Sequence, residues 1–268
     1  MIQGQTIQEL TRDAKLRLLR MHYDAKVGHI GGNLSALDIL LNLYHVAMTP
    51  ADAFVLSKGH AAGALYVTLW SLGRLTDEDL STFHKDNTRL PGHPPTRGID
   101  DVLFATGSLG HGLGLASGLA LARKLKREPG RVYCLTSDGE WNEGSCWESL
   151  IFARHQKLDN LTLIVDANGL QGFGSTKEVA DLDPIAEKFR SFDLTTLEVD
   201  GHDPAALSAA LRQTSTTPVV IIATTRKGCG VSFMENKMEW HYSQMSAADY
   251  EQALAEVNRA CEMSSAGQ

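Results

Sequence analysis

Residues 132–171 read VYCLTSDGEWNEGSCWESLIFARHQKLDNLTLIVDANGLQ. Two apolar segments, RVYCLTS at 131–137 and NLTLIVDAN at 160–168, are both expected to be buried strands. The residues between them fit a turn followed by a helix. A strand, a helix and a second strand in this order predict two parallel neighbours in one sheet. Each run also ends in a turn-forming pair, Asp138-Gly139 and Asn168-Gly169.

The same alternation continues on both sides of this stretch. Thr6 is a plausible N-cap for an amphipathic helix that begins at Ile7, and Thr76 with Asp79 resembles a capping box. We further expect Ser35 to cap an apolar helix that runs through Ala47. The other expected elements are a strand at 53–57, a helix ending near 73, a helix opened by residues 106–114, a strand at 193–199, a helix at 203–212, an interior strand at 218–225 and a last helix at 247–261. Residues 1–268 therefore predict one α/β domain, a parallel β-sheet flanked by helices on both faces.

Composition limits the class of protein. The 268 residues are 43% hydrophobic and 21% charged, and their formal net charge is −7, which argues against a nucleic-acid groove. No apolar run approaches the roughly 20 residues of a membrane helix, and the first residues carry no apolar signal core. The four cysteines form no CxxC pair and are expected to be free thiols. A cytoplasmic enzyme without membrane or nucleic-acid partners fits these features.

Asp138 and Asn168 are the first candidate metal ligands, because each follows a predicted strand. Mg²⁺ and Ca²⁺ prefer oxygen ligands, and the Leu170 carbonyl offers a third. In parallel sheets, ligands bind beyond the carboxyl ends of the strands. Gly139 permits a close backbone approach, and the following helix start favours a diphosphate. Asp-Gly and Asn-Gly are also common turn pairs, so plain turn chemistry is the alternative at each position taken alone.

A glycine-rich segment, TGSLGHGLG at 106–114, is the second candidate binding feature. Its glycines allow the main chain to approach a ligand, although tight packing of a helix on a strand explains them equally well. No GxGxxG dinucleotide fingerprint can be written through them, and the chain contains no GxxxxGK phosphate loop.

Five of the ten histidines lie in loops or turns among glycine or proline: His29, His60, His93, His111 and His241. Neutral imidazoles in such positions suit hydrogen bonds to hydroxyls and phosphate, and proton transfer near neutral pH. No histidine and cysteine have the close spacing that is typical of a zinc site. We expect His22, His45, His84 and His155 to lie within helices, and His202 to shape its turn. Trp70, Phe152 and Phe189 fall at core spacing in helices.

Together these segments resemble the thiamine-diphosphate-binding half of transketolases, over nearly the whole chain. Six motifs occur in the order of that family: VGHIGGNLSALDIL at 27–40, FVLSKGHAAGALY at 54–66, LPGHPP at 90–95, TGSLGHGLGLASGLALA at 106–122, the stretch at 137–171 and KGCGVSFMENKMEWHY at 227–242. The resemblance implies the thiamine-diphosphate-binding fold, in its diphosphate-binding domain. It also implies transfer of a two-carbon ketol unit from a ketose or its phosphate to an aldose or its phosphate.

The resemblance assigns roles residue by residue. The metal, Mg²⁺ or Ca²⁺, would be held by Asp138, Asn168 and the carbonyl of Leu170. The cofactor thiamine diphosphate would be contacted by His60, Gly107, Ser108, Leu109, Asp138, Gly139, Glu140, Asn168 and His241. The catalytic residues would be His29, His93 and His241, which would bind ketose hydroxyls and move protons. Glu143 would belong to an acidic network that couples two active sites, or would cap a helix.

The chain departs from the pattern of the family at three positions. Ser108 stands where many relatives have proline, His111 where many have glutamine, and Gly169 where many have lysine. These differences leave the metal ligands in place and affect the expected lining near the thiazolium ring.

The resemblance covers one half of a transketolase. The domain that binds the aminopyrimidine, and a third domain, would be on a separate C-terminal transketolase subunit, in an α2β2 assembly. The nearest rival is another thiamine diphosphate enzyme, of the 2-oxo acid dehydrogenase or deoxyxylulose-phosphate synthase type, which lacks the GHPP and ENKMEWHY segments. A non-catalytic module that retains the cofactor site is the rival from another class.

Overall fold

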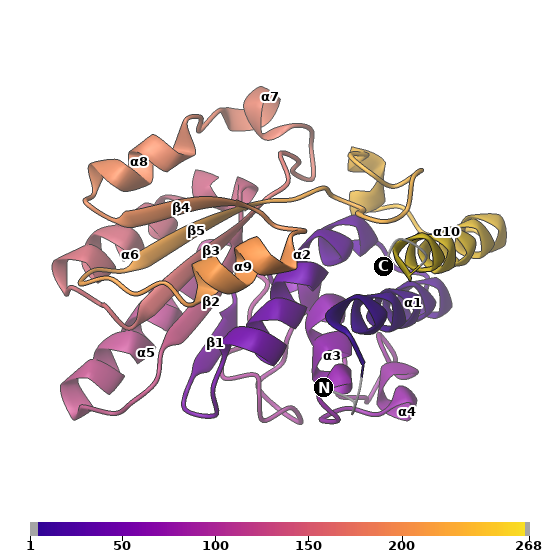
Figure 1. The fold of residues 1–268 in the computed structure, drawn as a ribbon, viewed down its shortest axis with the longest axis horizontal. Helices are drawn as coiled ribbons and strands as arrows, with labels where there is room; N and C mark the ends of the chain where they lie inside the picture. The colour runs from indigo at the N-terminus through magenta and orange to yellow at the C-terminus, as the bar shows by residue number, and fades with distance from the viewer. Residues whose placement is uncertain (1–4, 266–268) are drawn as a thin grey trace.

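A five-stranded parallel β-sheet forms the centre of the protein in a computed structural model that describes residues 5–265, with side chains for residues 5–260 (Figure 1). The strand order is β1-β2-β3-β5-β4, so β5 lies inside the sheet, as expected. The strands are β1 (Ala53–Leu56), β2 (Val132–Ser137), β3 (Leu161–Ala167), β4 (Thr195–Asp200) and β5 (Val219–Thr224). Every pair of neighbours is parallel, which confirms the predicted fold class.

Ten α-helices lie in the part of the chain that the structure describes. They are α1 (Ile7–Ala25), α2 (Ile30–Asn42), α3 (Ala62–Ser71), α4 (Asp77–Leu80), α5 (Gly112–Lys126), α6 (Gly144–His155), α7 (Thr176–Ala180), α8 (Ile185–Ser191), α9 (Pro204–Leu211) and α10 (Ala247–Ser265). A π-helical turn at Leu43–Ala47 extends α2, and short 3₁₀ turns occupy Gly59–Ala61, Gly139–Asn142 and Met238–His241. The predicted capping boxes at Thr6 and Thr76 both form.

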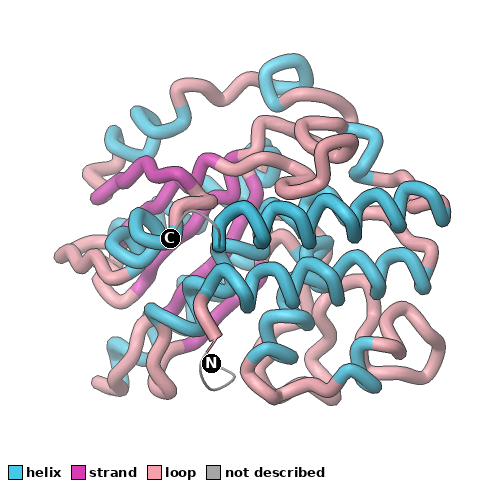
Figure 2. The backbone as a smooth tube through the Cα atoms, turned by 45° about the vertical axis from the view of Figure 1, so that its right-hand side comes forward, coloured by secondary structure: helices cyan, strands magenta, loops and turns pink. Residues whose placement is uncertain are grey.

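The helices cover both faces of the sheet. Helices α5, α6 and α8 pack on one face, and α2 and α9 lie on the other. Helix α1 packs against α2 and α3 and carries α10 on its outer side, so that α1 and α10 run side by side (Figure 2). The chain thus adds a further layer of helices on the α2 face.

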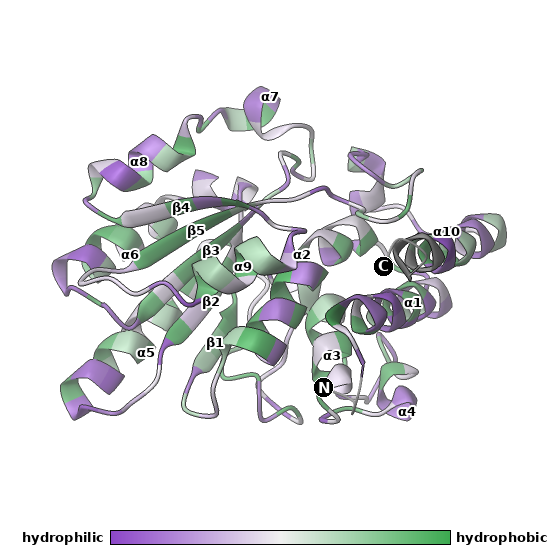
Figure 3. Cartoon of the chain, viewed as in Figure 1, coloured by the Kyte–Doolittle hydropathy of each residue, from purple (hydrophilic) through white to green (hydrophobic). Residues whose placement is uncertain are grey.

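The apolar runs of the strands explain the two cores. Successive side chains of a strand point to opposite faces, so a strand covered on both faces needs apolar residues throughout. In β5, Ile221 packs in the core on the α2 face, whereas Val220 and Ile222 pack with α5 and α6. Most of the sheet is accordingly coloured as hydrophobic, whereas much of α1 is coloured as hydrophilic (Figure 3).

Helix α2 begins earlier than the sequence predicts. It starts at Ile30, and Ser35 lies inside it instead of capping it. The hydroxyl of Ser35 donates to Asp166 Oδ2 at 2.7 Å, so this polar residue satisfies a buried carboxylate rather than a helix end. The glycines that suggested a loop lie in the first turn of the helix, where Gly31 faces Lys227 and Trp240.

Three other predictions from single residues had mixed outcomes. Phe189 is fully buried, as expected, but Phe152 is 40% exposed on α6. His84 lies in a turn after α4 with a φ of 61°, and not within a helix. Among the cysteines, Cys134, Cys146 and Cys229 are free thiols, and the side chain of Cys261 lies outside the described residues. None of the described helices combines the length and the apolar character that a membrane crossing requires.

Truncation of Ile221 should measure how strongly the α2 face holds the sheet. This side chain is completely buried in β5, so Ile221→Ala should lower the free energy of unfolding by about 3 kcal/mol. Urea denaturation followed by circular dichroism measures the change. Leu125→Ala is the matched control, because Leu125 is 75% exposed and its truncation should cost less than about 0.5 kcal/mol. Equal losses in both variants would contradict this account of the core.

Candidate functional site

Asp138 and Asn168 lie side by side at the carboxyl ends of β2 and β3. These strands are neighbours, with Ser137 paired to Asp166. Asp138 Oδ2 accepts the amide N–H of Gly169 at 2.6 Å, and its Oδ1 accepts that of Gly139 at 2.7 Å. The two turn pairs are therefore joined through one carboxylate, and the sequence expectation that they meet at a single edge is confirmed.

The surroundings of Asp138 fit a divalent cation. Burial and the nearby Asp166 raise the pKa of Asp138 to about 6, so a bound cation would relieve an unfavourable negative charge. Asn168 Oδ1 faces the same turn and accepts the Leu170 N–H at 3.1 Å. Within the described part of the chain, no hydrogen bond reaches the Leu170 carbonyl. Asp138 and Gly169 also line a cavity of about 270 Å³.

A buried ion pair lies directly behind this edge. Lys58 follows β1, and its ammonium binds Asp166 Oδ2 with both side chains at most 1% exposed. Ser35 and Thr225 also donate to the Asp166 carboxylate. Burial alone would raise the pKa of Asp166, but Lys58 and these hydroxyls hold it below its ordinary value. A charged lysine is thus fixed next to the candidate metal ligands.

The four loop histidines that the resemblance singles out gather into one cluster. The ring centroid of His29 lies 5.7 Å from that of His60, 6.2 Å from that of His93 and 5.1 Å from that of His241. The rings of His60 and His241 are 5.6 Å apart. Four segments that are distant in the sequence therefore place their imidazoles around a common point.

Asn33 holds two of these loops together. Its side-chain amide donates to the carbonyls of His29 at 2.8 Å and His60 at 3.0 Å, and its Oδ1 accepts the Ala64 N–H at 2.7 Å. His29 has a left-handed backbone, with a φ of 69°. The amide N–H of His29 donates to the carbonyl of His241 at 2.8 Å. This bond fixes residues 227–242, the closing segment, against the loop that carries His29.

The clustered imidazoles are neutral near pH 7. Burial is the largest effect on each ring and lowers its pKa, to about 3 for His241 and well below the ordinary value for His60. The same cause lowers the pKa values of His29 and His93. Neutral rings offer one donor and one acceptor each, which suits hydrogen bonds to sugar hydroxyls and proton transfer.

Lys227 connects the histidine cluster with the Asp138 edge, the edge of the sheet where Asp138 and Asn168 follow β2 and β3. Its ammonium lies 2.9 Å from His241 Nδ1 and 3.5 Å from the carbonyl of Gln171. Burial and Lys58 lower the pKa of Lys227 to about 8. Only 2% of the surface of this residue is exposed to solvent. Gln171 in turn packs over Gly139, where an added Cβ would lie 2.7 Å from Gln171 Cγ. The histidine cluster and the Asp138 edge are therefore parts of one continuous site.

The glycine-rich turn before α5 closes the site on the side of His93. Gly107 has a φ of 155°, and a Cβ there would lie 3.0 Å from His93 Cδ2, so this position requires glycine. Glu140 braces the turn: its Oε1 accepts the Gly110 N–H at 2.9 Å and the hydroxyl of Ser57. Its Oε2 accepts the Ser137 N–H at 3.2 Å, so both side-chain oxygens make internal bonds.

The remaining predicted residues lie at the margins. Ser108 is exposed and Leu109 half-buried, and the exposed His111 places Nδ1 3.0 Å from the Leu109 carbonyl. Glu143 precedes α6 and makes no side-chain capping bond to it, which leaves the capping alternative without support.

Sequence reasoning missed Lys58, Lys227, Asn33 and Asp166. One signal was available for each lysine, since both are followed by glycine in predicted loops, at Lys58-Gly59 and Lys227-Gly228. Asp166 reads as the end of an apolar strand, and only the sheet order shows that it faces Lys58.

The fold and the site are those of a thiamine-diphosphate-binding α/β domain. Residues 11–259 match the family described as "Transketolase, thiamine diphosphate binding domain". The chain is 37% identical to one of the apulose-4-phosphate transketolase subunits of Phocaeicola vulgatus, with 97% of each chain covered. It is 35% identical to the 6-deoxy-6-sulfo-D-fructose transketolase subunit SqwG of a Clostridium species, over 87% of this chain and 89% of that one.

Solved structures agree with these relatives. The transketolase of Campylobacter jejuni superposes with a TM-score of 0.85 at 29% identity, covering 94% of this chain and 42% of that one. A transketolase from Pichia stipitis superposes with a TM-score of 0.86 at 27% identity, covering 94% and 41%. The chain thus spans about two-fifths of these transketolases. It belongs to the transketolase family of transferases. Its length matches that of one subunit of a split transketolase.

Removal of Lys58 should destabilise the protein strongly. Lys58→Ala leaves the Asp166 carboxylate buried without its cation, and we expect a loss of about 3–5 kcal/mol in the free energy of unfolding at pH 7. Lys124→Ala is the control, because it breaks an exposed ion pair with Asp159 and should cost less than about 1 kcal/mol. Guanidinium denaturation measures both. A loss for Lys58→Ala no larger than that of the control would refute the structural role of the pair.

Proposed function

We propose that this chain supplies the diphosphate- and metal-binding half of a thiamine-diphosphate-dependent transketolase that transfers a two-carbon ketol unit from a ketose, or its phosphate, to an aldose. One observation carries the proposal. The Asp138 edge and the histidine cluster are joined by Lys227 and Gln171 into a single site at the carboxyl ends of the strands. A metal-diphosphate group and a polyhydroxylated substrate need these two kinds of surroundings next to each other.

The proposal assigns the metal, Mg²⁺ or Ca²⁺, to Asp138, Asn168 and the carbonyl of Leu170. The cation would offset the negative charge that Asp138 and Asp166 concentrate at this edge. His60, Gly139 and His241 would contact the diphosphate, and Gly107, Ser108 and Leu109 would line the ring and linker of the cofactor. We add Lys227 to this set, because its ammonium lies beside His241 and faces the Asp138 edge.

When bound, the cofactor supplies the electron sink for carbon–carbon bond cleavage. The chain contributes orientation and proton transfer. His29, His93 and His241 are neutral, so each can accept a proton from a substrate hydroxyl or donate one to a developing alkoxide. Lys227 adds a positive charge beside His241 that would stabilise negative charge near this ring.

A second chain would complete the enzyme. The matched relatives are named as transketolase subunits, which supports a separate C-terminal chain in, by our proposal, an α2β2 assembly. Helices α5 and α6 pack together, and exposed apolar side chains lie on both: Leu115, Ile151 and Phe152. Their exposure supports a partner surface there.

The names of the relatives support a choice of donor sugar. They place apulose phosphate and a sulfonated fructose among the sugars that such subunits process, so we propose a phosphorylated or sulfonated ketose as donor. The three free cysteines among the described side chains support a cytoplasmic location.

The metal assignment predicts the effect of removing Asp138. Asp138→Ala should weaken the Mg²⁺-dependent binding of thiamine diphosphate at least about tenfold, because a principal charged ligand is lost. Isothermal titration calorimetry of the purified chain, with Mg²⁺ and with EDTA, measures this. Glu251→Ala, an exposed carboxylate on α10, is the control and should bind normally. Undiminished metal-dependent binding by Asp138→Ala would rule out the assignment.

The two-chain proposal predicts activity only in a mixture. This chain, a C-terminal transketolase subunit, thiamine diphosphate and Mg²⁺ together should transfer ketol units from xylulose 5-phosphate, and neither chain alone should do so. His29→Ala should lower kcat on the order of a hundredfold, and the exposed His155→Ala should leave it unchanged. Activity of this chain without a partner would overturn the split-enzyme proposal, and equal rates for both histidine variants would overturn the role of His29.

A further inference from the structure

A second group of reactive side chains lies outside the candidate cofactor site. Asp38 on α2, His202 in the turn after β4 and Cys229 in the turn after β5 place a carboxylate oxygen, a ring nitrogen and the thiol sulfur within 4.8 Å of one another. Cys229 is buried, and Asp38 and His202 are partly buried. Neither the metal ligands nor the histidine cluster includes any of the three residues.

The hydrogen bonds of His202 define its orientation. Nδ1 lies 2.6 Å from Asp38 Oδ2, and Nε2 lies 2.9 Å from the amide nitrogen of Arg226. A backbone N–H can only donate, so Nε2 is an acceptor and the ring proton is on Nδ1, directed at Asp38. Burial would raise the pKa of Asp38, but Lys15 and the bond to His202 hold it below its ordinary value. Burial would lower the pKa of His202, but Asp38 and the neighbouring Cys229 raise it to about 9, so the ring takes up a proton readily. A charged carboxylate thus orients a basic imidazole, as in nucleophilic enzymes.

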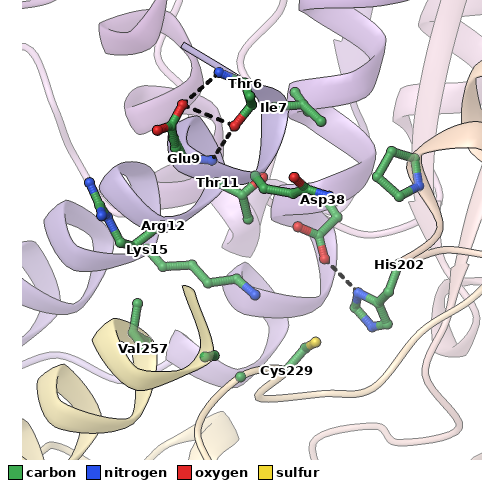
Figure 4. A pocket seen from close by; sticks show the side chains of 14 residues that line it. Thr6, Ile7, Glu9, Thr11, Arg12, Lys15, Asp38, His202, Cys229 and Val257 are labelled. Carbon is green, nitrogen blue, oxygen red and sulfur yellow. Dashed lines mark hydrogen bonds and ion pairs between the residues drawn. The ribbon is translucent and has the colours of Figure 1, made fainter. Parts of the chain in front are cut away.

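The thiol of Cys229 faces a cavity in which positive charge is available. Asp38, His202 and Cys229 line a cavity of about 430 Å³ between α1, α10 and the turn after β5. Figure 4 shows their side chains and that of Lys15 turned toward the same space. Arg226 Nη2 donates to Cys229 Sγ at 3.5 Å, and a ring nitrogen of His202 lies within 4.8 Å of the sulfur. Cations beside a thiol stabilise the negative charge that sulfur carries when it attacks.

The same contacts argue against a metal ion at this cluster. A metal bound at Nδ1 would displace the bond between this nitrogen and Asp38 Oδ2. A metal bound at Nε2 would displace the Arg226 amide and would leave Asp38 bonded to the other side of the ring. The guanidinium of Arg226 would also lie close to any cation held by Cys229. The donor set therefore fits a nucleophilic thiol better than a metal ligand.

We propose that Cys229 is a peroxide-reactive thiol that Asp38 and His202 activate. The thiol gives its proton to Nε2 of His202, at the expense of the bond from the Arg226 amide, and Asp38 stabilises the resulting imidazolium. Sulfur attacks one oxygen of hydrogen peroxide or a small hydroperoxide, an S–O bond forms and the O–O bond breaks. The departing hydroxide or alkoxide takes the proton from His202 and leaves as water or alcohol. Sulfur loses two electrons, the peroxide gains them, and Cys229 becomes a sulfenic acid.

The labelling pattern of the unmodified full chain tests the proposal directly. The protein is treated with hydrogen peroxide in the presence of dimedone, which traps sulfenic acids, and is then digested with trypsin. Cys229 falls in the peptide 228–237, Cys134 and Cys146 share the peptide 132–154, and Cys261 falls in 260–268, so mass spectrometry separates them. Burial raises the pKa values of the Cys134 and Cys146 thiols, which makes them internal controls. Cys229 should be labelled on the order of tenfold faster than the 132–154 peptide.

Two matched variants test the activation. His202→Asn should slow dimedone labelling of Cys229 about tenfold or more, and His155→Asn, which changes an exposed histidine on α6, should leave it unchanged. Labelling of Cys229 no faster than that of the 132–154 peptide in the unmodified chain would overturn the proposal, even if His202→Asn failed to fold. Stoichiometric binding of Zn²⁺ that Cys229→Ser abolished would also overturn it, because the cluster would then be a metal site. Neither measurement depends on thiamine diphosphate binding or on transketolase activity.

Discussion

Asp166 is buried at the end of β3, and its carboxylate binds side chains from three other parts of the chain. Lys58 reaches it from the turn after β1, Ser35 from α2 and Thr225 from the end of β5. A buried carboxylate must have its charge and its lone pairs satisfied, so these partners are held in one arrangement. That arrangement fixes the edge of the sheet on which Asp138 and its neighbouring turn lie.

The histidine cluster depends on the same part of the fold. Helix α2 carries Asn33, which binds the carbonyls of His29 and His60, and it also carries Ser35, which binds the buried carboxylate. One helix therefore sets the position of the imidazoles relative to the candidate metal ligands. The left-handed backbone of His29 and its bond to the His241 carbonyl extend this order to the closing segment. The low pKa values of the rings follow from burial that α2 and the closing segment impose together.

Local sequence patterns predict the strands, because their continuous apolar runs require cover on both faces, but the strand order depends on contacts between distant segments. The resemblance to transketolases located the four clustered histidines, but not the polar groups behind them. Ser35 looked like a helix cap because capping is local, yet its partner Asp166 is 131 residues away. Lys58 and Lys227 looked like ordinary loop lysines, and the partner of His202 lies 164 residues away. Buried polar groups are satisfied by distant partners, which no periodicity in the sequence reports.

The turn after β5 shows how one short segment serves both sets of polar groups. Lys227 points toward His241 on the cofactor side, whereas Cys229, two residues later, faces the cavity beside α1. Gly228 between them has a φ of 80° and donates its N–H to the Gly31 carbonyl at 2.9 Å, and a Cβ there would lie 2.4 Å from a backbone carbonyl oxygen. Because the backbone between the two side chains is anchored to α2 and tightly packed, each side chain keeps to its own side. The polar groups around Cys229 therefore lie apart from the cofactor site, although only Gly228 separates Cys229 from Lys227 along the chain.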